Sequence, residues 1–156
     1  MPFEYLPIMA HNSAPKPARV LAMPSKRAWS PVTKAVSQSR VALLSSAALR
    51  LADQEPFIPR EDLSYRRVAS DPKAGQIIID HHSGIGTVPK QDPEIVFPRS
   101  ALAALVEKRV VGALSPFHFS FMGGVRRHQE IENVLAPALA DELAAAEVDL
   151  ALLIPY

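Results

Sequence analysis

The chain has 156 residues, of which 48% are hydrophobic and 21% charged, and its net charge is +1. This size and composition are typical of one globular domain with a core of its own. Because the chain has no cysteine, it has no disulfide, no thiolate metal site and no cysteine nucleophile. No segment approaches the roughly 18 apolar residues of a membrane span, and the N-terminus lacks a signal-peptide pattern, so we expect a cytoplasmic protein with no membrane partner.

The first 39 residues differ from the rest in proline content and charge. Six of the 15 prolines lie there, and the only acidic residue among several lysines and arginines is Glu4. Proline fixes φ and removes a donor, so we predict an extended, basic, Pro-rich arm over residues 1–39, followed by an α/β domain over residues 40–156. Aromatic residues do not alternate with the basic ones, so we expect no nucleic-acid partner.

Apolar runs and turn residues predict the elements of the folded part. Short unbroken apolar runs favour buried strands, whereas apolar positions three and four residues apart favour helices. Pro137 interrupts a helical stretch, which we therefore divide in two. In chain order we expect a strand within 40–49, turns over 51–75, a strand over 76–80, a loop over 81–96, a helix over 97–110, a strand over 110–114, a loop over 115–124, helices over 127–134 and 137–147, and a buried strand over 150–154.

Strands that alternate with helices, and that carry apolar runs on both faces, indicate an α/β fold. We predict a three-layer sandwich with a mostly parallel sheet. In open α/β sheets, ligands bind at the carboxyl ends of the strands. Residues that directly follow a predicted strand are therefore the first candidates for a site.

Histidines follow two of the predicted strands. His81 and His82 come after the strand over 76–80, and His118 comes after the strand over 110–114. A histidine in such a place acts as an acid, a base or a metal ligand, or it makes only local hydrogen bonds. If the strands are parallel, His81 and His118 converge. A zinc site formed by His81, His82 and His118 is a weaker alternative, because the spacing matches no ligand motif.

Other candidate residues contact substrate rather than transfer protons. Ser120, Gly123 and Gly124 follow His118, and a Gly-Gly pair lets the backbone approach a ligand closely. Arg66 is a candidate bidentate clamp for a substrate carboxylate. The alternative for Arg66 is a local network of charges in a loop, and for the segment around His118 it is an aromatic core segment.

Several segments, taken in order, resemble the selenoprotein subunits of D-proline reductase and of glycine/sarcosine/betaine reductase. The most specific stretch is 96–124, in which Phe-Pro enters a helix, a strand with a glycine follows, and Pro-x-His-x-x-Phe-Met-Gly comes last. The matching segments are "WSPVTK", "VALLSSAAL", "DLSYRRVASD", "VFPRSALAALVEKRVVGALSPFHFSFMGG" and "VDLALL". The chain departs from the family's pattern at Ala48, Arg50 and Gly84–Ile85, which leaves the substrate open.

The resemblance implies reductive cleavage of a C–N bond of D-proline, glycine, sarcosine or betaine. It implies a selenocysteine or cysteine nucleophile directly after the last strand, beyond Tyr156, with His81 and His118 as the family's histidines. The chain would then be the N-terminal portion of a subunit, truncated where a UGA codon is read as stop, and inactive by itself. The resemblance also implies an oligomer, a partner subunit with a pyruvoyl group, and a dithiol or thioredoxin-type reductant.

Two other functions remain open at this point. One is a non-catalytic subunit that binds substrate or acts as a scaffold in such a complex. The other is a metal-dependent hydrolase that uses the histidines with an aspartate, although the resemblance implies no metal.

Overall fold

The computed structural model describes residues 30–81 and 87–156 of the chain. Most of the predicted arm, and His82 with the glycines after it, lie outside the described residues. Residues Val32–Tyr156 form one compact unit. The predicted domain boundary at residue 40 stays a prediction.

The described residues contain one main sheet and one small sheet. The strands of the main sheet are β1 (Arg40–Ser45), β3 (Tyr65–Ala69), β5 (Ala113–Leu114), β6 (Phe117–Phe121) and β7 (Leu150–Ile154). The small sheet pairs β2 (Leu49–Leu51) with β4 (Ile77–Ile79) in antiparallel fashion. In the main sheet β1 runs parallel to β5, β6 and β7, and only the β3–β6 pair is antiparallel. The prediction of a mostly parallel sheet is confirmed.

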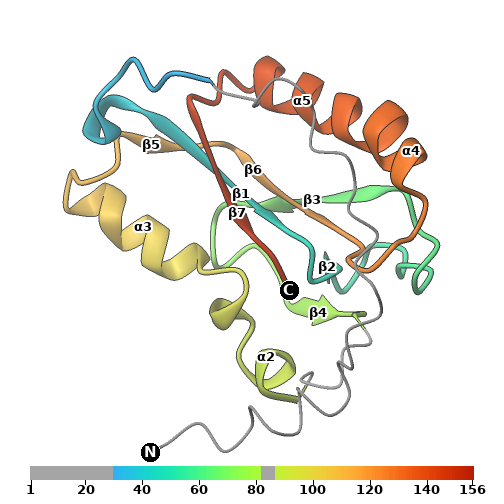
Figure 1. Cartoon of the computed structure of the whole chain (residues 1–156). Helices are drawn as coiled ribbons and strands as arrows, with labels where there is room; N and C mark the ends of the chain where they lie inside the picture. The colour runs from blue at the N-terminus through green and yellow to red at the C-terminus, as the bar shows by residue number, and fades with distance from the viewer. Residues whose placement is uncertain (1–29, 82–86) are drawn as a thin grey trace, which may run out of the picture. The chain divides into compact units, whose positions relative to one another are not determined.

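Strand β1 lies at the centre of the sheet because it has neighbours on both sides. Leu44 pairs with Phe119 of β6 on one side and with Leu153 of β7 on the other. The lateral order is therefore β3, then β6 with β5 as its extension toward the amino end, then β1, then β7. Figure 1 shows β1 and β7 side by side and pointing the same way.

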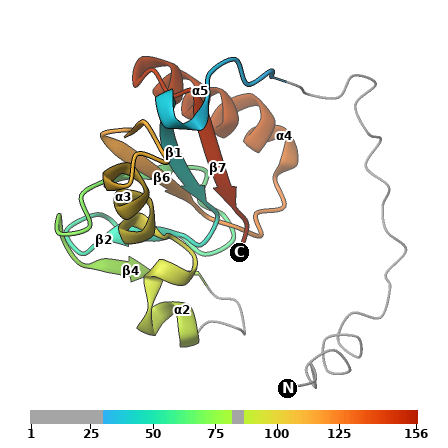
Figure 2. The same cartoon turned by 90° about the vertical axis from the view of Figure 1, so that its left-hand side faces the viewer.

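Helices cover both faces of the sheet. They are α2 (Thr87–Gln91), α3 (Arg99–Glu107), α4 (His128–Glu130) and α5 (Ala136–Ala145), with the short 3-10 turns η1 (Val36–Gln38) and η2 (Pro93–Ile95) and a π-helical segment η3 (Ile131–Leu135). Leu43 packs with Leu102 of α3, whereas Leu139 of α5 packs with Phe119 and Leu44. Since Leu43 and Leu44 point to opposite faces of one strand, the two helices lie on opposite faces, as Figure 2 shows. The predicted three layers are confirmed.

The predicted break at Pro137 is wrong, because α4, η3 and α5 follow one another without an intervening loop. Pro137 lies in the first turn of α5, which directly follows the π-helical segment η3. The turn before it is π-helical, and such a widened turn leaves room where a proline ring would otherwise clash with the preceding carbonyl. The chain therefore passes the proline as one helical stretch.

Two segments expected to lack strands contain them. The stretch 51–75 contains β3, and the expected loop over 115–124 contains β6, which is a central strand. The alternation of phenylalanines with polar residues in Phe117–Phe121 is a strand pattern, and its polar positions are buried because His118 and Ser120 bond to backbone groups of β1 and its neighbours. Within the expected loop over 81–96 the structure forms α2 and η2.

The last strand, β7, forms where it was predicted but it is not buried. Leu152 and Leu153 expose 45% and 59% of their surface. In the described chain β7 pairs with β1 alone, so its far edge has no neighbouring strand. Its apolar run therefore lies at the edge of the sheet rather than in its centre.

Candidate functional site

Residues that follow four strands meet at the carboxyl edge of the main sheet. They are Ser46 after β1, His81 after β4, Gly123 after β6 and Tyr156 after β7, and we name them the carboxyl-edge cluster. Ser46 and Tyr156 are joined by a hydrogen bond in which the Tyr156 N–H donates to Ser46 Oγ at 2.9 Å. The chain end is thereby tied to the end of the central strand.

His81 lies against Tyr156 and Gly123. The rings of His81 and Tyr156 meet edge to face, with their centroids 5.1 Å apart and an interplanar angle of 77°. The Tyr156 hydroxyl is buried and has no hydrogen-bond partner among the described residues. A buried polar atom without a partner costs free energy, so the Tyr156 hydroxyl is a strained feature of the cluster.

Gly123 allows the backbone of β6 to approach the ends of β1 and β4 closely. A Cβ at this position would lie 2.7 Å from the Ser46 carbonyl oxygen and 3.0 Å from Nε2 of His81. Real Cβ atoms do not approach backbone atoms so closely, so only glycine fits without a shift. Gly123 therefore sets the spacing between His81 and the end of β1.

An ion pair holds the segment from which His81 extends. Nε of Arg50 donates to Oδ2 of Asp80 at 2.8 Å, and both side chains are largely buried. The same carboxylate accepts from the Phe57 N–H at 2.9 Å, and the Asp80 N–H donates to the Ala48 carbonyl at 3.0 Å. Because Asp80 directly precedes His81, this network positions the imidazole at the carboxyl edge.

His118 lies inside the core instead of at the carboxyl edge. Its side chain is fully buried, and its Nδ1 accepts a hydrogen bond from the Leu43 N–H at 3.2 Å. Between the short β1–β5 and β1–β6 ladders the backbone pairing is interrupted, and the imidazole supplies the missing acceptor there. The Nε2 atom is buried without a hydrogen-bond partner among the described residues.

The surroundings of His118 keep its ring neutral. Burial, and next the positive charge of Arg99, lower the pKa of His118 to about 4. Arg99 is itself buried, and it donates to the carbonyls of Ala69 and Asp71 at 3.0 and 3.1 Å. Burial likewise lowers the pKa of Arg99. In this arrangement His118 acts as a hydrogen-bond acceptor inside the sheet, and a catalytic role for it stays a prediction.

The predicted substrate-binding residues lie in several places. Ser120 is fully buried, where its hydroxyl accepts from the Leu49 N–H at 2.7 Å and donates to the Ser45 carbonyl at 3.1 Å. Gly123 belongs to the carboxyl-edge cluster, and Gly124 lies beside a surface hollow of about 480 Å³ lined with arginines. The structure thus places Gly123 with His81.

Arg66 makes the local network that the sequence left open as an alternative. Its guanidinium donates to the Glu55 carbonyl at 2.9 Å and to Ser64 Oγ at 2.6 Å, and it lies 3.7 Å from Asp62. It also stacks over the Phe57 ring at 4.2 Å from the centroid. A bidentate clamp on a substrate would require breaking these contacts, and that role stays a prediction.

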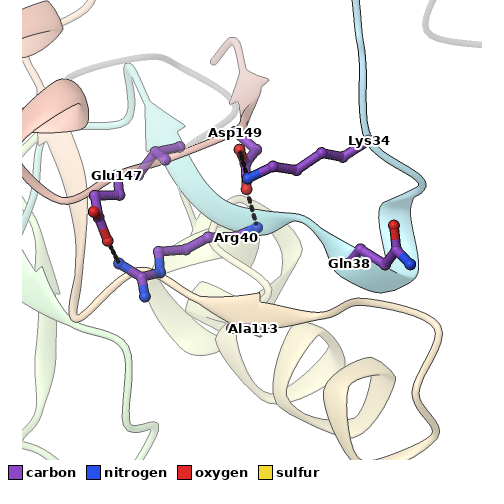
Figure 3. Close-up of a pocket in the computed structure, with 7 residues that line it drawn as sticks. Lys34, Gln38, Arg40, Ala113, Glu147 and Asp149 are labelled. Carbon is purple, nitrogen blue, oxygen red and sulfur yellow. Dashed lines mark hydrogen bonds and ion pairs between the residues drawn. The ribbon is translucent and has the colours of Figure 1, made fainter.

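A second hollow lies at the opposite, amino edge of the sheet (Figure 3). Lys34 pairs with Asp149 at 2.6 Å, and Asp149 also accepts from the Arg40 N–H at 2.9 Å. Arg40 reaches Glu147 at 3.3 Å. The charged side chains that line this hollow pair with one another. They tie the start of β1 to the start of β7 and leave little charge for a ligand.

Two features of the described residues bear on the alternatives. Within 30–81 and 87–156, no three histidine, aspartate or glutamate side chains gather as a set of metal ligands, and His82 lies outside this part. In the same part, no helix is long and apolar enough to cross a membrane.

Sequence reasoning missed the residues that position His81. Ser46 and Tyr156 carry no motif, and their contact joins residues 110 positions apart. Arg50 and Asp80 are visible in the sequence as two opposite charges near predicted strands. Opposite charges on paired strands are the signal that indicates such an ion pair. Arg99 gave no signal, because an arginine in a helix is ordinarily solvated.

Comparison with known proteins links the chain to one enzyme subunit. It is 26% identical, over 125 residues, to D-proline reductase subunit gamma of Acetoanaerobium sticklandii, a match that covers 80% of this chain and 52% of that subunit. The chain therefore spans about half the length of the curated relative it matches. No family model matches the chain, and no solved structure does. The resemblance to a D-proline reductase subunit that we predicted from the sequence is confirmed, and the chain is distantly similar to that subunit.

Proposed function

We propose that this chain is the substrate-side portion of a reductase subunit that cleaves a C–N bond of an amino acid or amine. The relationship to D-proline reductase subunit gamma carries this proposal. The carboxyl-edge cluster supports this proposal, since the cluster lies where α/β folds bind ligands. The chain has no cysteine, so the nucleophile comes from polypeptide outside these 156 residues, and a cysteine or selenocysteine is the residue that the resemblance implies.

His81 is the group we assign to proton transfer and to stabilisation of the nucleophile. A thiolate or selenolate beside a histidine is favoured over its protonated form. His81 packs on Gly123, where the absence of a side chain leaves the ring close to the strand ends. Tyr156 orients the imidazole through the edge-to-face contact. His118, Ser120 and Arg66 then support the site through the fold instead of touching the substrate.

The proposed reaction balances with a dithiol as reductant. The nucleophile attacks the carbon next to nitrogen, the C–N bond breaks, and nitrogen keeps the electron pair and takes a proton. One thiol of the dithiol then attacks the sulfur or selenium of the nucleophile, and the carbon leaves with its electron pair and is protonated. This forms a mixed disulfide or selenenyl sulfide, which the second thiol of the same dithiol breaks, so the dithiol supplies two electrons and two protons overall. For D-proline the product is 5-aminopentanoate.

The same resemblance suggests the partners of the chain. We place the chain in an oligomeric, cytoplasmic complex with a pyruvoyl-bearing subunit that holds the substrate amine, and with a dithiol or thioredoxin-type reductant. None of the described residues is assigned to hold the pyruvoyl group. The substrate stays among D-proline, glycine, sarcosine and betaine.

A scaffold without catalytic residues is the second candidate. It is favoured by the way that Arg66, Ser120 and His118 are occupied by bonds within the fold. In that case the chain stabilises the complex, and removal of the His81 imidazole leaves turnover unchanged.

The test measures 5-aminopentanoate formed from D-proline with dithiothreitol. The chain is assayed alone. It is also assayed after co-expression with the D-proline reductase subunits of A. sticklandii, where full-length subunit gamma is replaced by the part of subunit gamma that this chain does not match. We expect no turnover by the chain alone and turnover by the assembly, and we expect His81→Ala to lower kcat by about 100-fold or more. Turnover by the isolated chain, or an assembly in which His81→Ala is as fast as the parent, contradicts the proposal.

A further inference from the structure

The far edge of β7 is open and unprotected in the part of the chain that the structure describes. Natural proteins protect an edge strand with charges, proline or a bulge, because its free N–H and C=O groups otherwise pair with other strands. The run Leu150–Ile154 has no charged residue, and its proline follows only at position 155. This edge therefore has the properties of one that another strand covers.

Both faces beside this edge expose leucine side chains. In the β1–β7 register Leu152 lies beside Leu43, on the face of α3, and Leu153 lies beside Leu44, on the face of α5. Their exposed fractions are 45% and 59%. A strand laid along β7, with apolar side chains on both faces, would bury these two leucines and continue both layers of the core.

A hollow next to Leu153 extends the same apolar surface. It has a volume of about 280 Å³, and only apolar side chains line it, among them Leu44, Phe121, Leu139, Leu143 and Leu153. Together, the edge of β7, the two leucines and this hollow form one surface, which we name the β7 surface.

We propose that the β7 surface binds a polypeptide that corresponds to the part of D-proline reductase subunit gamma which this chain does not cover, and that this polypeptide adds a strand parallel to β7. This inference rests on the proposed function. The chain matches only 52% of that subunit, so the relative has nearly as much polypeptide again outside the match. The β1–β7 pair is parallel, and α/β sheets grow by further parallel strands.

The parallel direction distinguishes this occupant from a second copy of the chain. In a symmetric pair of copies the two β7 strands would run antiparallel, so that each carboxyl-edge cluster would lie at an opposite end of the interface. A parallel strand ends beside Tyr156 and His81, and the residues that follow it reach the cluster. In this arrangement a nucleophile that directly follows the added strand lies at the site.

The test co-expresses the tagged 156-residue chain with the uncovered part of A. sticklandii subunit gamma, and measures the mass of the purified complex by light scattering. We expect a one-to-one complex. Leu153→Lys should weaken its affinity at least tenfold, because it places a charge in the apolar hollow. Ile58→Lys is the matched control, since Ile58 is 62% exposed and lies far from β7 in sequence, and it should leave affinity unchanged.

Hydrogen exchange gives a second measurement. In the complex, the β7 amides that face away from β1 should exchange at least tenfold more slowly than in the chain alone. The absence of a complex, a complex that tolerates Leu153→Lys, or a homodimer of this chain that Leu153→Lys dissociates each overturns the inference. These readouts are of binding, so a complex that forms but lacks turnover counts against the proposed function and leaves the β7 surface intact.

Discussion

The Nδ1 atom of His118 accepts a hydrogen bond from the backbone N–H of Leu43 at 3.2 Å, in the centre of the main sheet. The bond joins two strands at a point where their backbone pairing is interrupted. It requires an unprotonated Nδ1, so the neutral ring is part of the folded structure.

Stability should consequently fall as the pH drops below the ordinary pKa of histidine. The pKa of His118 is lowered from 6.5 to about 4 in the folded chain, so the unfolded chain binds a proton that the folded chain excludes. The contribution of His118 to the free energy of unfolding is full above pH 6.5 and is lost as the pH falls toward about 4, by about 3 kcal/mol in total. Urea unfolding across this range measures the loss.

Two variants separate this effect from the carboxylates that titrate at lower pH. His118→Asn keeps an acceptor near Leu43 without a titrating group, so its stability should depend less on pH over the same range. His118→Leu leaves the Leu43 N–H unsatisfied and should cost about 1–3 kcal/mol at neutral pH. A parent protein with the same pH slope as His118→Asn would refute the assignment.

Gly123→Ala should destabilise the chain and disturb His81. The new Cβ would lie 2.7 Å from the Ser46 carbonyl oxygen, so backbone must shift, at a cost of about 1–3 kcal/mol. The His81 ring resonances in an NMR spectrum should move as well. Gly124→Ala is the control, because that position has open space and a φ of +70°, so only backbone strain of about 1 kcal/mol is expected and His81 should stay in place. Equal His81 shifts in both variants would contradict the role of Gly123.

Breaking the Arg50–Asp80 pair should be costly in either direction. The pair is largely buried, so Arg50→Met or Asp80→Asn leaves a charge without its partner and should lower the free energy of unfolding by about 3 kcal/mol. The exposed Arg127–Glu130 pair is the comparison, and Arg127→Met there should cost about 0.5 kcal/mol or less. Chemical denaturation of the single and double variants measures both couplings, and equal values at the two pairs would be inconsistent with the structure.

Ser46→Ala should release Tyr156 from the carboxyl edge. The Ser46 hydroxyl accepts the Tyr156 N–H at 2.9 Å, so without it the Tyr156 amide should exchange with solvent at least tenfold faster. Ser39→Ala removes a hydroxyl bond of similar length at the amino edge and should leave the Tyr156 amide unchanged. A Tyr156 amide that exchanges equally fast in the parent and in Ser46→Ala would show that this hydrogen bond does not form.

Most of the fold was predictable from apolar patterns. The strands at 40–45 and 150–154 and the helix at 99–107 are local signals, because a short apolar run or a stripe of leucines has few other uses. β6 was harder, since His118 and Ser120 look like loop residues until their backbone partners across the sheet are known. The π-helical turn that lets the helix pass Pro137 also depends on packing that no local pattern encodes.

The candidate site divides in the same way. His81 was a candidate because a histidine after a strand is a local feature. Gly123 was predicted to let the backbone approach a ligand, and the structure places it against His81 and the end of β1 instead. Ser46 and Tyr156 were not predicted as site residues, because the bond between them joins the ends of β1 and β7 across most of the chain.

Residue types and short-range spacing were enough to predict the α/β class, the absence of a cysteine nucleophile, the likeness to a reductase subunit and most of the strands. The burial of His118, the contacts of Arg66 within its own loop and the edge of β7 that is open among the described residues became known from the three-dimensional fold. Burial and hydrogen-bond partners depend on residues distant in the chain, which local patterns do not show. Leu152 and Leu153, for example, belong to the core or to the surface according to whether another strand lies beside β7.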